Sequence, residues 1–256
     1  MWDARNDPKL RFSLTSTHGA GAMCPRPGVV AHDWYNGGVM RWLRAALFVA
    51  TAVAMAPGHA SAQDPPPAIG PFAFDLHGVF ARFPTADKQL SDSRGLDLQD
   101  LPGAGLGLHG GATVYPLRWK AVTFGFGADV TVARVHGAEK SVGAVRVRRA
   151  VTERFTHVAP VISFNFGSGN GWSYISGGIG PAIWSVLPDG ATASGPDVEH
   201  LQTINYGGGA RWFLNRHLAF GFDVRFYAIN PSTPVSDRPN GPRKTLRFMG
   251  AGISIK

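Results

Sequence analysis

The 256-residue sequence predicts an all-β fold: an eight-stranded, antiparallel, up-and-down transmembrane β-barrel preceded by a cleavable signal peptide. Three observations lead to this prediction. An export signal lies in the N-terminal quarter, eight segments alternate between bulky and small residues, and the connections between these segments alternate in length. An even number of strands joined by alternating long loops and short turns is typical of barrels in the outer membrane of Gram-negative bacteria.

The export signal occupies residues 40–62. It has a short basic start (Met40–Arg44), an uncharged apolar run over 45–56 and a small-residue cleavage site at 60–62, which is the pattern of a secretory signal peptide. The apolar run is too short for a membrane-spanning helix, which needs about 20 residues. We interpret residues 1–39 as a mis-assigned N-terminal extension, with translation starting at Met40.

Composition supports export rather than nucleic-acid binding. The formal net charge is +8, but six of the 25 Lys and Arg and three of the 17 Asp and Glu precede residue 63, which leaves +5 for the mature chain. No basic stripe interleaved with aromatic residues is present, so we expect no nucleic-acid partner. The 33 glycines argue against a mostly helical protein, because glycine destabilises helices. The single cysteine, Cys24, excludes an internal disulfide in this chain.

Residues 63–71, which are rich in proline, are expected to form an extended periplasmic lead-in, and the barrel is expected to occupy 72–256. Alternation with a period of two indicates a strand, and it marks eight segments in chain order: 72–82, 106–115, 122–132, 156–166, 172–187, 202–213, 218–228 and 245–255. Six of these have clear faces, and 122–132 is the clearest, with Val122, Phe124 and Phe126 alternating with Thr123 and Gly125.

Two of the segments have faces that the pattern does not assign. In 172–187, Ile175 and Ile179 share one parity while Trp172 and Trp184 share the other. In 245–255, Leu246 and Phe248 disagree in parity with Ile253 and Ile255, and a β-bulge that switches the parity is the expected explanation.

The bulky faces carry no charge through their middle, whereas the small faces contain glycine and charged residues. A charge facing lipid at the bilayer midplane costs about 2–4 kcal/mol, so the bulky face is predicted to meet lipid and the small face to line the lumen. A soluble barrel, the alternative, would need the reverse orientation. The predicted lumen residues are Asp75, His77, His109, Asp129, Arg211, Asp223 and Arg225.

We expect Arg211, Asp223 and Arg225 to form a paired network that closes the lumen, because unpaired charges in a narrow interior are costly. The two histidines and nearby aspartates raise the alternative of a metal or proton site, but no ligand spacing on one strand supports it, and we expect no metal and no cofactor. Aromatic residues gather near the short turns and predict an interfacial girdle: Tyr115, Trp119, Phe166, Trp172, Tyr174, Trp212 and Phe213.

The chain resembles the outer-membrane β-barrel domain family, of the small eight-stranded kind exemplified by the OmpA transmembrane domain. The signal, GLGLHGGATVYP (105–116), FGFGADVTV (124–132), WSYISGGIGP (172–181) and NYGGGARWFLNRHLAFGFDVRFY (205–227) carry this resemblance. It implies insertion by the barrel-assembly machinery and a role as a membrane anchor, an adhesin, a narrow pore or, rarely, a lipid-modifying enzyme.

From these observations we expect a monomeric, non-enzymatic outer-membrane protein with a structural or surface-interaction role. A narrow pore for small solutes, which would make the chain porin-like, is the main alternative. The second long loop is basic and is a candidate contact for lipopolysaccharide phosphates, although a merely solvated loop is the simpler reading; its candidate residues are Lys140, Arg146, Arg148 and Arg149. A lipid A deacylase is a further alternative, but His157 and Ser163 are six residues apart, about 20 Å along a strand.

Overall fold

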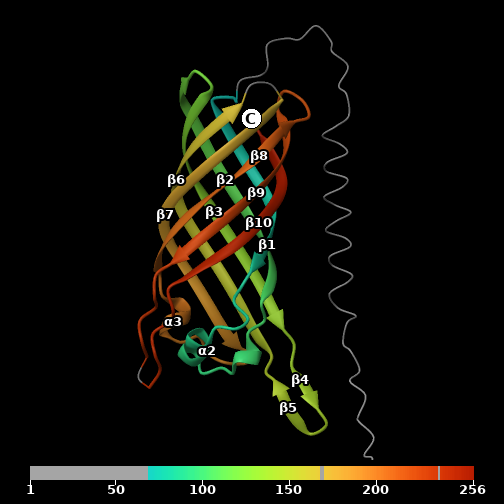
Figure 1. Ribbon diagram of the computed structural model, residues 1–256, viewed down its shortest axis with the longest axis vertical. Helices are drawn as coiled ribbons and strands as arrows, with labels where there is room; N and C mark the ends of the chain where they lie inside the picture. Colours follow the sequence, from blue (N-terminus) through green and yellow to red (C-terminus); the bar gives the residue numbers. More distant parts are fainter. Residues whose placement is uncertain (1–68, 168–169, 236) are drawn as a thin grey trace, which may run out of the picture. The chain divides into compact units, whose positions relative to one another are not determined.

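The computed structural model describes residues 69–167, 170–235 and 237–256. Its eight main strands form a closed antiparallel barrel, which confirms the predicted fold class (Figure 1). Each strand pairs with its neighbours in sequence, and the last strand closes on the first. The predicted extension (1–39), the signal peptide (40–62) and residues 63–68 of the predicted lead-in lie outside the described residues.

The barrel strands are 11 to 18 residues long. In chain order they are β1 (Phe72–Arg82), β2 (Ala104–Trp119), β3 (Val122–Gly137), β6 (Val151–Gly167), β7 (Gly171–Pro188), β8 (Leu201–Phe213), β9 (Leu218–Ile229) and β10 (Lys244–Ile255). The long connections contain short elements: α2 (Lys88–Arg94), a 3-10 turn η1 (Leu98–Asp100), the hairpin β4 (Lys140–Val142) and β5 (Val145–Arg148), and α3 (Gly195–Val198).

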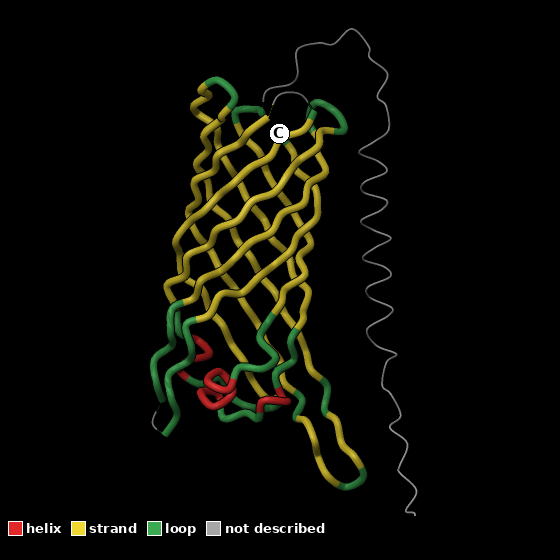
Figure 2. Tube along the Cα trace, in the orientation of Figure 1, coloured by secondary structure: helices red, strands yellow, loops and turns green. Residues whose placement is uncertain are grey.

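The two ends of the barrel differ, as the alternating connection lengths predict. Short connections between β2 and β3, between β6 and β7 and between β8 and β9 lie at the end that also holds the C-terminus (Figure 2). The helices and the β4–β5 hairpin lie at the opposite end, within the long connections (Figure 1). We call these the turn end and the loop end. No helix in the described part of the chain is long and apolar enough to cross a bilayer.

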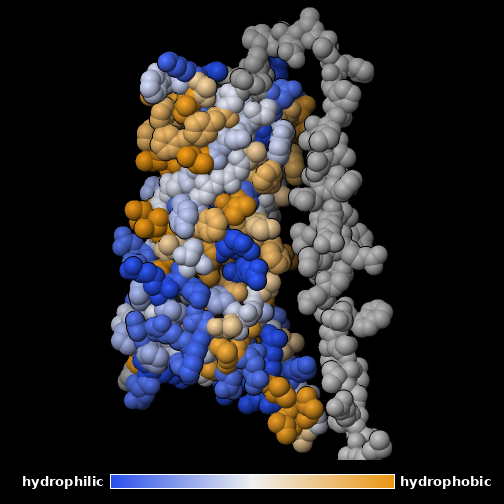
Figure 3. All heavy atoms as spheres, in the orientation of Figure 1, coloured by the Kyte–Doolittle hydropathy of each residue, from blue (hydrophilic) through white to orange (hydrophobic). Residues whose placement is uncertain are grey.

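The two faces of the sheet have the predicted orientation. Bulky residues point outward and are exposed: Phe72, Leu106 and Phe126 leave 45%, 72% and 55% of their surface accessible. Charged residues of the opposite parity point inward, and Asp129 and Asp223 are only 4% and 2% exposed. We call the outward apolar residues the outer belt; orange atoms gather on this surface mostly toward the turn end in Figure 3, and blue atoms toward the loop end.

The two strands whose faces the sequence does not assign, β7 and β10, each keep the same inward parity along their whole length. In β10, Leu246 and Phe248 point inward at 1% exposure, Ile253 and Ile255 point outward, and the pairing with both neighbours continues without a register shift. The expected bulge in this strand is therefore wrong. The structure instead has large residues inside the barrel near the loop end, where the lumen holds an apolar cluster rather than small side chains.

The predicted aromatic girdle is only partly correct. Three of its residues point outward and are exposed: Trp119, Phe166 and Trp212. The other four are buried inside the barrel, at 8% exposure or less: Tyr115, Trp172, Tyr174 and Phe213. Tyr115 lies on the inner side because it has the same parity along β2 as the buried His109 and Thr113. Aromatic side chains therefore fill the turn end of the lumen as well as marking its rim.

Glycine has a second role beyond keeping the lumen narrow. A Cβ on Gly127 of β3 would lie 2.0 Å from the carbonyl oxygen of Ala112 on β2, where no real side chain fits. Gly209 of β8 is in the same position against the carbonyl oxygen of Phe222, at 2.1 Å. At these positions glycine lets neighbouring strands approach and coil closely, as in a small, strongly curved barrel.

Candidate functional site

The lumen is the candidate functional site, and it is filled in three layers. At the turn end lies an apolar cluster that contains Tyr115, Trp172 and Phe213. At the loop end a larger apolar cluster contains Phe155 and Phe248. Between these clusters the interior carries the charged residues that the sequence predicts, all of them with buried side chains.

The first ion-pair centre joins β8 to β1 across the lumen. Arg211 donates to both carboxylate oxygens of Asp75, from Nε to Oδ1 at 2.9 Å and from Nη2 to Oδ2 at 2.7 Å. Its Nη1 donates to Asn165 Oδ1 at 3.0 Å, and its guanidinium carbon lies 4.0 Å from the centre of the Tyr174 ring. Ser254 donates to Asp75 Oδ1 at 2.5 Å. Such a bidentate, fully partnered pair is the strongest form of arginine–carboxylate contact.

The second ion-pair centre is nearer the loop end. Arg225 donates from Nε to Asp223 Oδ2 at 2.8 Å and from Nη1 to Asp129 Oδ2 at 3.1 Å. Asn205 donates to the same oxygen of Asp129 at 2.9 Å. The pairing differs in one respect from the sequence prediction, because Arg211 binds Asp75 and not Asp223. β1 and β8 are far apart in sequence and face each other across the lumen, so periodicity alone could not identify this pair.

Both predicted lumen histidines are inside, each 1% exposed. His77 Nδ1 lies 3.3 Å from Asp223 Oδ1. His109 Nδ1 lies 2.8 Å from the hydroxyl of Thr131, which is in turn 2.8 Å from the hydroxyl of Tyr227. Within the described ranges, no group of three or more His, Cys, Asp or Glu side chains is placed to hold a metal ion.

Little space remains in the charged layer. The void between the two ion-pair centres is lined by Asp75, Asp129, Arg211 and Arg225 among others and has a volume of about 10 Å³. This is close to the minimum that accommodates one water molecule. Six further residues complete these centres, and none was predicted individually: Asn165, Asn205, Thr131, Tyr174, Tyr227 and Ser254. Parity marks Thr131, Asn165, Asn205 and Tyr227 as lumen residues, whereas Tyr174 and Ser254 lie in the two segments whose faces the sequence does not assign.

The first long loop covers the loop end of the lumen. Leu90 of α2 is fully buried in the loop-end apolar cluster. Arg94, at the end of the same helix, donates from Nη2 to the carbonyl oxygens of Trp184 and Pro196, each at 3.1 Å, and its Nη1 is 3.4 Å from Asp197. These contacts hold α2 against the ends of β7 and α3.

A buried carboxyl group, that of Glu153, lies inside the barrel near the contacts of Arg94. Glu153 lies on β6 beyond the outer belt, points inward and accepts a hydrogen bond from Trp184 Nε1 at 2.8 Å. Burial raises the pKa of Glu153 to about 8, and neither this hydrogen bond nor the attraction of Arg94 offsets the loss of hydration. The folded protein therefore favours the neutral carboxyl group at neutral pH.

The four basic residues predicted on the second long loop differ in their exposure to solvent. Lys140 and Arg146 of the β4–β5 hairpin are exposed, but Arg148 and Arg149 are half-buried. The Arg149 backbone N–H donates to Asp100 Oδ1 at 2.7 Å, and its side chain lies 4.0 Å from the same carboxylate. Of these four residues, Lys140 and Arg146 are therefore the most accessible to an external anion.

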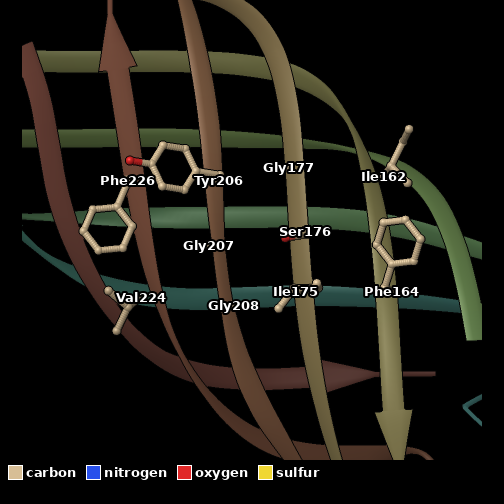
Figure 4. Close-up of a pocket in the computed structure, with 10 residues that line it drawn as sticks. All are labelled: Ile162, Phe164, Ile175, Ser176, Gly177, Tyr206, Gly207, Gly208, Val224 and Phe226. Carbon is tan, nitrogen blue, oxygen red and sulfur yellow. The ribbon is translucent and has the colours of Figure 1, made fainter. Parts of the chain in front are cut away.

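A groove crosses the outer surface of β6 to β9, with a volume of about 540 Å³ (Figure 4). Gly177 and Gly208 leave its centre low, and larger side chains surround it. These are Ile162, Phe164, Ile175, Tyr206, Val224 and Phe226. The groove is part of the outer belt and is lined almost entirely by apolar atoms.

A comparison with protein-family models found no match, and a comparison with curated proteins found none either. Among solved structures, the chain is similar to the crystal structure of Neisserial surface protein A. The two chains are 12% identical with a TM-score of 0.48, and the similar region covers 73% of this chain and 97% of the other. The closed eight-stranded barrel described above is established by the strand pairing of this chain itself.

Proposed function

We propose that this protein is an integral barrel of the bacterial outer membrane with a structural or surface-interaction role. The observation that carries this proposal is the inverted barrel: large apolar side chains cover the outside while paired charges are buried inside. In water such an outside would be an exposed apolar patch far larger than a soluble monomer carries. In a bilayer it becomes the lipid contact, and the closed sheet leaves no unpaired edge in the hydrocarbon.

Membrane fractionation and a heat-modifiability gel test this location. We expect the protein in the outer-membrane fraction, migrating faster before boiling than after it, because the folded barrel resists detergent. Recovery in the soluble periplasmic fraction, without a mobility shift on boiling, would refute the location and the barrel's membrane role together.

We further propose that the lumen does not conduct. Its support is the filling of all three layers and the void of about 10 Å³ between the ion-pair centres. In planar bilayers the wild-type protein is expected to show no steady ohmic conductance, and Arg211→Ala to raise the conductance by opening the charged layer. A large, steady wild-type conductance would instead favour the narrow pore.

A catalytic role is not part of the proposal. His157 and Ser163, the candidate pair for acyl hydrolysis, both point into the lumen and are buried there, where an acyl ester of a membrane lipid has no access. Incubating the purified barrel with lipopolysaccharide is expected to release no fatty acid. Release of fatty acid would establish the deacylase alternative. Outer-membrane lipids, lipopolysaccharide and the barrel-assembly machinery are the proposed partners of the monomer.

A further inference from the structure

Four arginines point outward at the loop-side edge of the outer belt, where each is exposed. We call them the belt-edge arginines, and they are Arg82 of β1, Arg134 of β3, Arg154 of β6 and Arg247 of β10. No side-chain hydrogen bond or ion pair joins any of them to another described residue. They are distinct from the basic residues of the β4–β5 hairpin, which belong to the loop beyond the barrel wall.

The strand register places these arginines in two adjacent pairs. Arg82 lies directly opposite Arg247 on β10, and Arg134 lies directly opposite Arg154 on β6. Opposite residues on one face of a sheet have Cβ atoms about 4.5–5.5 Å apart, and like charges in that position destabilise the sheet. Two such pairs without any carboxylate partner indicate that an external anion supplies the missing negative charge.

The pairs form an arc on one side of the barrel. Only β2 separates them, and at this height it presents Ala104 and Leu106, so a ligand can span both pairs without a steric or charged barrier. Five adjacent strands at about 4.8 Å spacing make the arc about 19 Å wide. On the other side, the outward residues near the loop ends of β7, β8 and β9 are uncharged: Ile183, Gln202 and Ala228. A general snorkelling rim would surround the barrel, whereas this arc covers one side.

The surroundings of the arc identify the ligand as a lipid. On three of the strands, the residue two positions from the arginine toward the turn end is apolar and 42% to 47% exposed. These residues are Phe80 next to Arg82, Met249 next to Arg247 and Val132 next to Arg134. Acyl chains fit against this apolar surface, while paired guanidinium groups bind phosphate oxygens bidentately. At the loop end, which is the extracellular end of an outer-membrane barrel, the phosphorylated lipid is a glycolipid of the outer leaflet.

We propose that the belt-edge arginines bind the phosphates of lipopolysaccharide and hold one such lipid against the β10, β1, β2, β3 and β6 side of the barrel. This inference rests on the proposed outer-membrane location and adds a defined site to it. The site lies on the barrel wall and not on the basic loop, whose Arg149 is already engaged with Asp100.

The test compares lipopolysaccharide retention by purified, folded barrels in zwitterionic detergent, measured by native mass spectrometry. The test variant is R82Q/R134Q/R154Q/R247Q, and the control is K140Q/R146Q, which removes exposed charge from the hairpin. We expect the fourfold variant to retain lipopolysaccharide at least tenfold less well than the wild type, and the control to stay within twofold. Dephosphorylated lipopolysaccharide is expected to bind the wild type as weakly as it binds the fourfold variant.

Three results would overturn the site. These are unchanged retention in the fourfold variant, a tenfold loss in the hairpin control instead, or equal binding of the dephosphorylated lipid. Competition by inorganic phosphate or by phosphatidylglycerol at the same concentration as lipopolysaccharide would reject the glycolipid as the ligand.

The heat-modifiability gel separates the two proposals, because a barrel that folds and shifts but shows no arginine-dependent retention refutes only the lipid site. A wild type without the shift refutes the outer-membrane barrel. A single-pair variant, R82Q/R247Q, is expected to give an intermediate loss if the fourfold variant fails to fold.

Discussion

Replacement of Arg211 by methionine is expected to destabilise the barrel strongly. Arg211 is 3% exposed and carries the positive charge that faces Asp75. Without the guanidinium, Asp75 keeps the hydroxyl of Ser254 and loses both short charged contacts. Asn165 loses a donor to its Oδ1 at the same time.

The expected loss in the free energy of unfolding is about 3–5 kcal/mol, the usual effect of leaving one member of a buried ion pair without its partner. Asp75→Asn alone leaves the buried guanidinium without a counter-charge and is expected to lose a similar amount. The double variant D75N/R211M removes both charges, and replacing a whole buried pair by neutral groups is often close to neutral. The two single losses should therefore not add.

The assay is urea unfolding of the barrel in lipid vesicles, followed by tryptophan fluorescence and the heat-modifiability gel. Because each single loss is about 3–5 kcal/mol and the double variant is close to neutral, the coupling energy from the four-protein cycle is expected to exceed the range of about 0.5–3 kcal/mol that is usual for contacting residues. R243M, at an exposed arginine in the last long loop, is the matched control and should change stability by less than about 0.5 kcal/mol. Additive losses in the double variant would refute the Asp75–Arg211 pair as the main interaction of the turn-side charged centre.

Three further predictions concern other parts of the barrel. The pKa of Glu153 is raised to about 8 in the folded protein, against about 4.5 in the unfolded chain. The contribution of Glu153 to stability is therefore complete below about pH 4.5 and is lost as the pH rises through 8. The urea midpoint of the wild type should fall between pH 5 and pH 9, and E153Q should abolish this fall. G127A should lower the free energy of unfolding by about 1–3 kcal/mol, because the added methyl group would clash with the Ala112 carbonyl oxygen. G195A, where a Cβ would meet open space, should leave the free energy of unfolding nearly unchanged in the same urea assay. L90A should loosen α2 and speed protease cleavage of the first long loop in intact vesicles. L98A, at a residue that is 44% exposed, should not. Equal cleavage of both variants would argue against α2 as a packed cover over the loop end of the lumen.

The sequence alone determined the strand number, the loop alternation and the facing of six strands. These follow from local features: a period of two needs only neighbouring residues, and connection length is counted directly. The lumen location of Asp129, Asp223, His77 and His109 follows for the same reason, because parity assigns a face. The position of the glycines was equally visible, although their close contacts with neighbouring strands were not.

Only the tertiary structure decided which lumen groups meet. Arg211 pairs with Asp75 because closure brings β1 and β8 to opposite sides of a narrow interior, and no periodicity within one strand encodes that distance. The same holds for Phe248 and Trp172, whose size suggests the lipid face although the ends of the lumen hold them inside. The arc of arginines also depends on closure, since Arg247 and Arg82 come from the last and first strands and become neighbours only when the barrel closes. Local pattern sets what each strand presents, and barrel closure sets which side chains share a space.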